Sequence, residues 1–118
     1  KRVIAETEKL AMDAKVKKVV VTSGKVYYDL LEAREERGIK DIAIIRIEQY
    51  YPFPRNELAG ELARYKNADV IWCQEEHENM GAWSFVDRRL EESILDADIK
   101  SKRPEYVGRA IAASPAAG

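Results

Sequence analysis

A run of three valines followed by a serine–glycine pair is the feature of this sequence that most restricts its fold. Val19, Val20 and Val21 are β-branched and uninterrupted, which is typical of a strand buried on both faces of a parallel sheet. Ser23 and Gly24 then supply a turn, and a helical spacing of apolar residues begins directly after it. The stretch therefore predicts a buried strand that turns sharply into a helix.

The rest of the chain repeats this strand–helix plan. Gly38 stands where a glycine commonly ends a helix, and Pro52 and Pro54 stop the strand before them because proline lacks the N–H donor. Asn56 is predicted to cap the next helix. We predict strands at residues 2–6, 19–21, 42–48, 69–74 and 106–109, and helices at residues 25–37, 56–66 and from about residue 80. Residues 7–18 are predicted to be an exposed connection, and residues 110–118 an arm of small residues.

This order of elements predicts a single α/β domain over residues 1–118. Short connections between strands and helices favour right-handed crossovers, and hence a three-layer α/β/α arrangement with a largely parallel sheet of about five strands. The order of the strands within the sheet does not follow from the sequence.

The composition excludes several classes of protein. The net charge of −1 provides no basic field to hold nucleic acid or an acidic membrane. The one cysteine excludes an intramolecular disulfide and is typical of a reducing compartment. No apolar run approaches the length of a membrane span. Because the chain opens at Lys1 rather than methionine, we expect a processed protein or a fragment of a longer one.

The aromatic residues give two packing predictions. Trp72 and Cys73 lie in an apolar strand, so we expect both in the core. Trp83 precedes the apolar stripe of the third helix, which consists of Phe85, Val86, Leu90 and Ile94. Since aromatic residues concentrate at interfaces, we expect Trp83 near a subunit or domain interface.

The carboxyl edge of the sheet is the place to look for a ligand, because open α/β sheets bind ligands there. The N–H groups around Ser23 and Gly24, together with the Lys25 ammonium, could receive one anionic group at the start of a helix. Arg109 ends a neighbouring strand and could add a guanidinium. The sequence alone favours the alternative, in which Ser23 caps the helix and Lys25 is solvated. A further alternative is that Glu75 or Glu76 neutralises the two cations.

No catalytic or metal-binding set emerges from the residues. The glycine-rich nucleotide motifs are missing. Cys73 and His77 supply only two of the ligands that a zinc site needs, and no nucleophile elbow is present. The acidic run that also includes Glu78 is interpreted as a solvated edge. Arg46 and Glu48 share one face of their strand, which favours an ion pair over a ligand-facing arginine.

Four long segments and a terminal motif resemble one known family. They are residues 23–30 (SGKVYYDL), 46–54 (RIEQYYPFP), 72–83 (WCQEEHENMGAW), 106–109 (YVGR) and 113–116 (ASPA). In this order they closely resemble the C-terminal domain of the 2-oxoglutarate dehydrogenases, the decarboxylating first components of their complexes. The resemblance covers nearly the whole chain. Family members usually continue with a further polar tail, and many have proline where this chain has His77.

The resemblance implies a transketolase C-terminal fold, with a five-stranded mixed sheet whose first strand is antiparallel to the others. It implies a parent homodimer that uses thiamine diphosphate and Mg²⁺ to decarboxylate 2-oxoglutarate and to pass the succinyl group to a lipoyl arm of the dihydrolipoyl succinyltransferase. The family's diphosphate motif, G-D-G followed by N-N, is missing here, so we expect the fragment alone to be inactive. The expected location is the cytoplasm in a bacterium and the mitochondrial matrix in a eukaryote.

The resemblance also implies an effector site. In some relatives this domain binds the activator acetyl-coenzyme A, and by position on the sheet edge we expect that site at Ser23, Lys25, Gln74 and Arg109. The alternative from another class is a free-standing α/β module that binds a small molecule or nucleotide.

Overall fold

The computed structural model describes residues 2–109. The predicted arm of residues 110–118 lies outside the described residues, as does the side chain of Arg109. No helix within the described range is long and apolar enough to cross a membrane.

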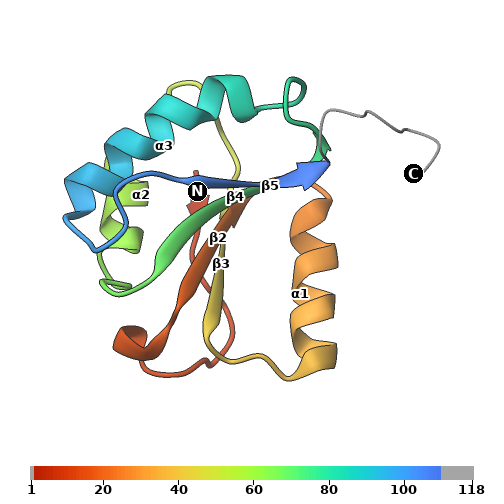
Figure 1. Cartoon of the computed structure of the whole chain (residues 1–118), viewed down its shortest axis with the longest axis vertical. Helices are drawn as coiled ribbons and strands as arrows, with labels where there is room; N and C mark the ends of the chain where they lie inside the picture. Colours follow the sequence, from red (N-terminus) through yellow and green to blue (C-terminus); the bar gives the residue numbers. More distant parts are fainter. Residues whose placement is uncertain (1, 110–118) are drawn as a thin grey trace.

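The chain forms one five-stranded mixed sheet (Figure 1). Its strands, in the spatial order β1-β3-β2-β4-β5, place the valine strand at the centre. β1 is antiparallel to β3, and the other neighbours are parallel. The predicted mostly parallel sheet with an antiparallel first strand is therefore confirmed. The strands are β1 Val3–Ile4, β2 Lys18–Thr22, β3 Ile42–Ile47, β4 Asp69–His77 and β5 Glu105–Arg109.

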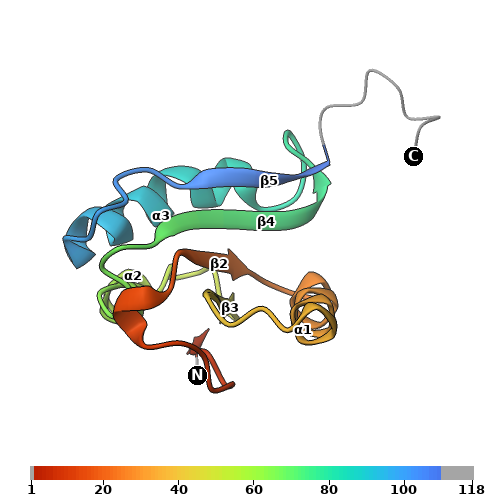
Figure 2. The same cartoon turned by 60° about the horizontal axis from the view of Figure 1, so that its bottom comes forward.

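Three helices cover the two faces of this sheet: α1 Val26–Arg37, α2 Arg55–Leu62 and α3 Trp83–Ala97. α2 and α3 lie together on one side, and α1 lies apart from them (Figure 2). Because side chains alternate along a strand, Val19 and Val21 face α2 and α3, while Val20 faces α1. The three-layer arrangement is confirmed, with two helices on one face and one on the other.

The main core lies between the sheet and the α2–α3 pair. Val86, Leu90 and Ile94 are fully buried, which confirms the predicted stripe of α3, although Phe85 is only half-buried. Trp72 is also in this core, as predicted. Burial of a large apolar side chain contributes roughly 1.5–3 kcal/mol, so this stripe is a main source of stability.

Trp83 also belongs to this core. Its side chain is buried, 8% exposed, and it packs against Tyr106 with the ring centroids 5.4 Å apart. The apolar stripe of α3 therefore begins at Trp83, and the expectation that Trp83 stands outside this stripe is wrong. Cys73 is half-buried rather than fully in the core.

The helix ends follow the predictions in part. Gly38 closes α1 in the left-handed conformation (φ 63°), as expected of a C-terminal glycine. The residue before α2 is Pro54 rather than Asn56, which lies inside the helix, and the helix ends at Leu62. The connection 7–18 is not uniformly exposed: its 3-10 turn at Asp13–Lys15 is exposed, but the next residue, Val16, is buried.

Candidate functional site

A cavity of about 290 Å³ opens at the carboxyl edge of the sheet, between the β2–α1 turn and the segment that links β4 to α3. It is the edge that the sequence analysis identified as the place to look for a ligand. Ser23, Gly24, Lys25 and Gln74 all line it, so the structure brings these four predicted site residues together. Its other lining residues include Tyr50, Glu75, Glu76 and Gly81.

The turn into α1 shapes one wall of this cavity. Gly24 has φ +66°, a conformation that residues with a side chain rarely adopt. The Ser23 hydroxyl bonds to the Tyr50 hydroxyl. The residue before the helix is Lys25, and no side chain caps the helix there. The alternative in which Ser23 caps α1 is therefore wrong, and the first N–H groups of α1 have no side-chain acceptor.

Tyr50, which lies in the connection between β3 and α2, also lines the cavity. Burial raises the pKa of its hydroxyl, the hydrogen bond with Ser23 opposes that rise, and the charge of Glu76 adds to it. The neutral hydroxyl is therefore favoured, and it is held in place by Ser23 on a different element.

Gln74 lines the cavity, and its side-chain amide forms hydrogen bonds within the domain. Its amide oxygen accepts from Trp72 Nε1 at 2.9 Å and from the backbone N–H of Trp83 at 3.0 Å. Its amide nitrogen donates to the carbonyl oxygens of Met80 at 2.7 Å and His77 at 2.9 Å. The side chain is buried, so Gln74 holds the segment between β4 and α3 in position rather than presenting a free amide to a ligand.

The charges around the cavity are mixed. Lys25 is exposed, and among the side chains that the structure describes it has no ion-pair partner. The expected alternative, in which Glu75 or Glu76 neutralises it by direct pairing, is not what the described side chains show. The backbone of Arg109 pairs with His77 in β5, which lies beside β4 and not beside the central strand β2, so the prediction that Arg109 ends a strand next to the central one is wrong.

The other residues that the sequence offered as candidates for binding or catalysis are involved in structural contacts. Arg46 forms an ion pair with Glu48 at 2.5 Å and donates to the Tyr28 hydroxyl at 2.8 Å, so the predicted ion pair is confirmed. Burial raises the pKa of the Cys73 thiol, which disfavours the reactive thiolate. Within residues 2–109 no group of three or more histidine, cysteine or acidic side chains is placed to hold a metal ion.

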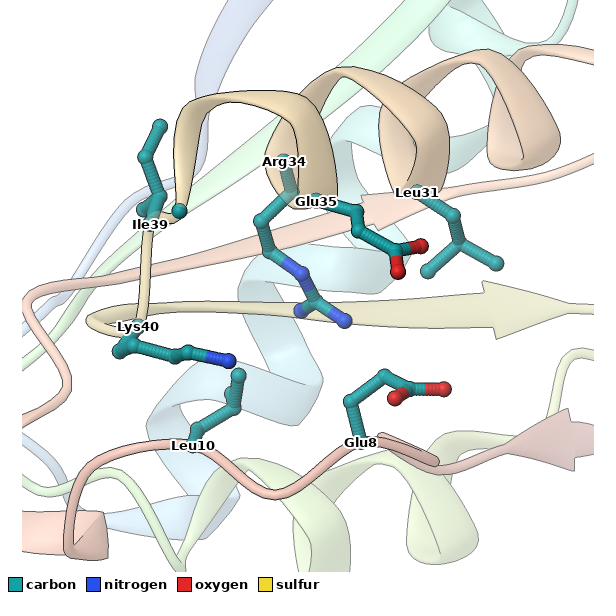
Figure 3. Close-up of a pocket in the computed structure, with 8 residues that line it drawn as sticks. Glu8, Leu10, Leu31, Arg34, Glu35, Ile39 and Lys40 are labelled. Atoms are coloured by element: carbon teal, nitrogen blue, oxygen red, sulfur yellow. The ribbon is translucent and has the colours of Figure 1, made fainter.

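A second cavity of about 170 Å³ lies at the other end of α1, under the connection 7–18 (Figure 3). Arg34 points into it from α1, with Glu8, Leu10 and Lys40 around it. The Arg34 guanidinium binds the Glu6 carboxylate with nitrogen–oxygen distances of 2.6 and 2.7 Å. This buried pair was missed by the sequence analysis.

A signal for this pair exists in the sequence. Arg34 follows Tyr27 and Leu30 at helical spacing, so it shares one face of α1 with apolar side chains. A charged residue that is buried on such a face needs a partner of opposite charge. The partner, Glu6, lies on a different segment, and no local pattern connects the two residues.

The amino-acid sequence is similar to that of known proteins. A family model described as "2-oxoglutarate dehydrogenase C-terminal" matches residues 1–118. The chain is 56% identical over 110 residues to the "2-oxoglutarate dehydrogenase E1 component" of Brucella anthropi, and the same values hold for the proteins of Brucella ovis and Brucella canis. Each match covers 93% of this chain and 11% of the relative, so the chain spans about a tenth of these proteins. The chain belongs to the 2-oxoglutarate dehydrogenase C-terminal family.

Proposed function

We propose that this chain is the C-terminal domain of a 2-oxoglutarate dehydrogenase. The observation that carries the proposal is the family match over all 118 residues, together with 56% identity to E1 components. The parent enzyme, in this proposal, is a homodimer that oxidatively decarboxylates 2-oxoglutarate with thiamine diphosphate and Mg²⁺. It then passes the succinyl group to the lipoyl group of the dihydrolipoyl succinyltransferase. Its location would be the bacterial cytoplasm or the mitochondrial matrix.

The domain itself has a structural and regulatory role in this proposal. The diphosphate motif of the family is missing from its sequence, so thiamine diphosphate and Mg²⁺ would bind to the preceding part of the parent chain. The fragment alone would have no decarboxylase activity, and the domain would act through its contacts with the rest of the enzyme.

The regulatory part of the proposal concerns the cavity at the carboxyl edge. Ser23, Gly24, Lys25 and Val26 line one concave edge at the start of α1, and such a helix start is a favourable place for a phosphate or carboxylate. Arg109 would add a guanidinium. Gln74 would support the site by holding the segment between β4 and α3, which forms the opposite wall of the cavity. Acetyl-coenzyme A, through its phosphates, is the effector that we propose to test.

The test compares this chain with its complete reading frame. Both proteins are assayed for 2-oxoglutarate-dependent reduction of ferricyanide in the presence of thiamine diphosphate and Mg²⁺. We expect turnover by the complete protein and none by the fragment above a heat-inactivated control. Turnover by the fragment, or a complete reading frame without 2-oxoglutarate activity, would contradict the proposal. A reading frame that encodes only this domain would favour a free-standing regulatory module.

A further inference from the structure

Three side chains, those of Tyr51, Phe53 and Arg89, lie around the ring of Phe85, in the first turn of α3. Tyr51 lies against this ring with the centroids 4.5 Å apart, and Phe53 lies 6.4 Å away. The Arg89 guanidinium lies over the ring at 3.7 Å from its centroid. Tyr51 and Phe53 come from the connection between β3 and α2, so two separate segments build one surface. We call Tyr51, Phe53, Phe85 and Arg89 the Phe85 patch.

The Phe85 patch leaves a large aromatic side chain in solvent. Tyr51 is 72% exposed, whereas Tyr27 and Tyr65 are 6% and 1% exposed. Isolated apolar side chains on a surface are ordinary, but Tyr51 lies tilted against the Phe85 ring, over which the Arg89 guanidinium also lies. Tyrosine, phenylalanine and arginine are the residues that protein interfaces prefer, and tyrosine and arginine often dominate their energetics.

The charge of the Phe85 patch is unpaired. Arg89 donates from one guanidinium nitrogen to the backbone carbonyl of Phe85 at 2.8 Å. Among the described side chains it has no ion-pair partner, whereas Arg55 and Arg103 each bind two carboxylates. The ring and the carbonyl fix the guanidinium in advance, so little side-chain freedom would be lost when a carboxylate binds to it.

We propose that the Phe85 patch is the contact surface through which this domain packs against another domain of its longer parent chain. The inference rests on the proposed function and adds the surface involved. The curated relatives extend far beyond this domain, which accounts for 11% of their length. The contacting surface would present an apolar side chain to the Tyr51 ring and a carboxylate to Arg89. The aromatic contact that was expected at Trp83 is thus assigned to Tyr51.

The first test is hydroxyl-radical footprinting of the complete, unsubstituted enzyme with peptide-resolved mass spectrometry. Tyr28, which is 58% exposed in this domain, is the matched tyrosine. With each rate normalised to that in the urea-unfolded enzyme, we expect Tyr51 to react about tenfold more slowly than Tyr28 because a packed interface excludes water. Equal normalised rates, whether both are fast or both are slow, would overturn the inference.

The second test identifies the occupant. Tyr51→p-benzoylphenylalanine is irradiated in the complete enzyme, and the cross-linked peptide is sequenced. A peptide from outside this domain supports the inference, while a peptide from the same domain of another copy, or no cross-link, overturns it.

Arg89→Glu should abolish the protection of Tyr51, and Arg88→Glu, at an exposed neighbour without a described ion pair, should leave it unchanged. An active enzyme with an unprotected Tyr51 would refute this inference alone and leave the proposed function standing.

Discussion

The Arg34 guanidinium and the Glu6 carboxylate form a two-pronged ion pair in which the side chains are only 7% and 4% exposed. Further hydrogen bonds hold it: Arg34 also donates to the carbonyl of Ile42, and Glu6 also accepts from the N–H groups of Ile44 and Glu8. Because Glu6 follows β1 and Arg34 lies in α1, the pair joins the first segment of the chain to the one-helix face of the sheet.

Removal of one partner of this pair should destabilise the fold strongly. Arg34→Ala leaves the Glu6 carboxylate buried without its counter-charge, which costs about 3–5 kcal/mol. Urea unfolding of the chain measures this loss. Arg37→Ala, at an exposed position in the last turn of the same helix, is the control and should change stability by less than about 0.5 kcal/mol. Equal effects of the two substitutions would show that the pair contributes nothing specific.

The same pair makes stability depend on pH. Burial alone would raise the pKa of Glu6, but hydrogen bonds from Arg34 and from the N–H groups of Ile44 and Glu8 hold it below the ordinary value of 4.5. The unfolded chain therefore binds this proton at a higher pH than the folded chain does. The contribution is complete above pH 4.5 and is lost as the pH falls through the folded pKa.

Glu6→Gln tests this sign. Wild type should be more stable than the variant at neutral pH, and the difference in the free energy of unfolding should shrink below pH 4.5. Thermal unfolding across this range measures the difference. A gap between the two proteins that stays constant with pH would contradict the prediction.

Loss of the Gln74 amide should destabilise the segment between β4 and α3, which forms one wall of the edge cavity. Gln74→Leu leaves the donors of Trp72 and Trp83 unpaired in a buried place, and each such group costs about 1–3 kcal/mol. Hydrogen exchange should accelerate over the segment between β4 and α3. The exposed Gln49→Leu is the matched control, with a loss of about 1 kcal/mol or less. Unchanged exchange in the Gln74 variant would mean that the amide does not hold this segment.

Anion binding at the edge cavity should depend on Lys25. Each charge-assisted hydrogen bond contributes about 1.5–3 kcal/mol before the costs of desolvation and ordering. Titration calorimetry with phosphate and with acetyl-coenzyme A should therefore show weaker binding for Lys25→Ala and for Arg109→Ala. Lys40→Ala, beside the other cavity, should bind as wild type does. Binding that is absent, or that neither substitution changes, would refute the assignment.

Truncation of a buried leucine of α3 should cost more stability than truncation of an exposed leucine on the same helix. Leu90 is fully buried and Leu95 is 52% exposed. Leu90→Ala should destabilise the fold by about 2–5 kcal/mol, since it removes contacts and leaves a cavity. Leu95→Ala should cost about 0.5 kcal/mol or less. Chemical unfolding measures both, and similar losses would contradict the assignment of the core.

Local patterns predicted the elements better than they predicted their partners. The valines of β2, the glycine that ends α1 and the stripe of α3 are signals within one element, and the structure confirms them. The strand order and the Glu6–Arg34 pair depend on contacts between distant segments, which no single pattern encodes. For the same reason the bond between Ser23 and Tyr50 displaced the predicted helix cap, because a neighbour in space competed with the local interaction.

The Gln74 amide also determines how this domain can be observed. The chain has two tryptophans; one donates its indole N–H to Gln74 and the other donates its backbone N–H to the same oxygen. Both tryptophans are therefore hydrogen-bonded to the side chain of Gln74, which lines the edge cavity. Because both indoles lie in the main core and Trp72 also lines the edge cavity, intrinsic fluorescence should respond to loss of the core packing and, through Trp72, to a ligand that enters the cavity.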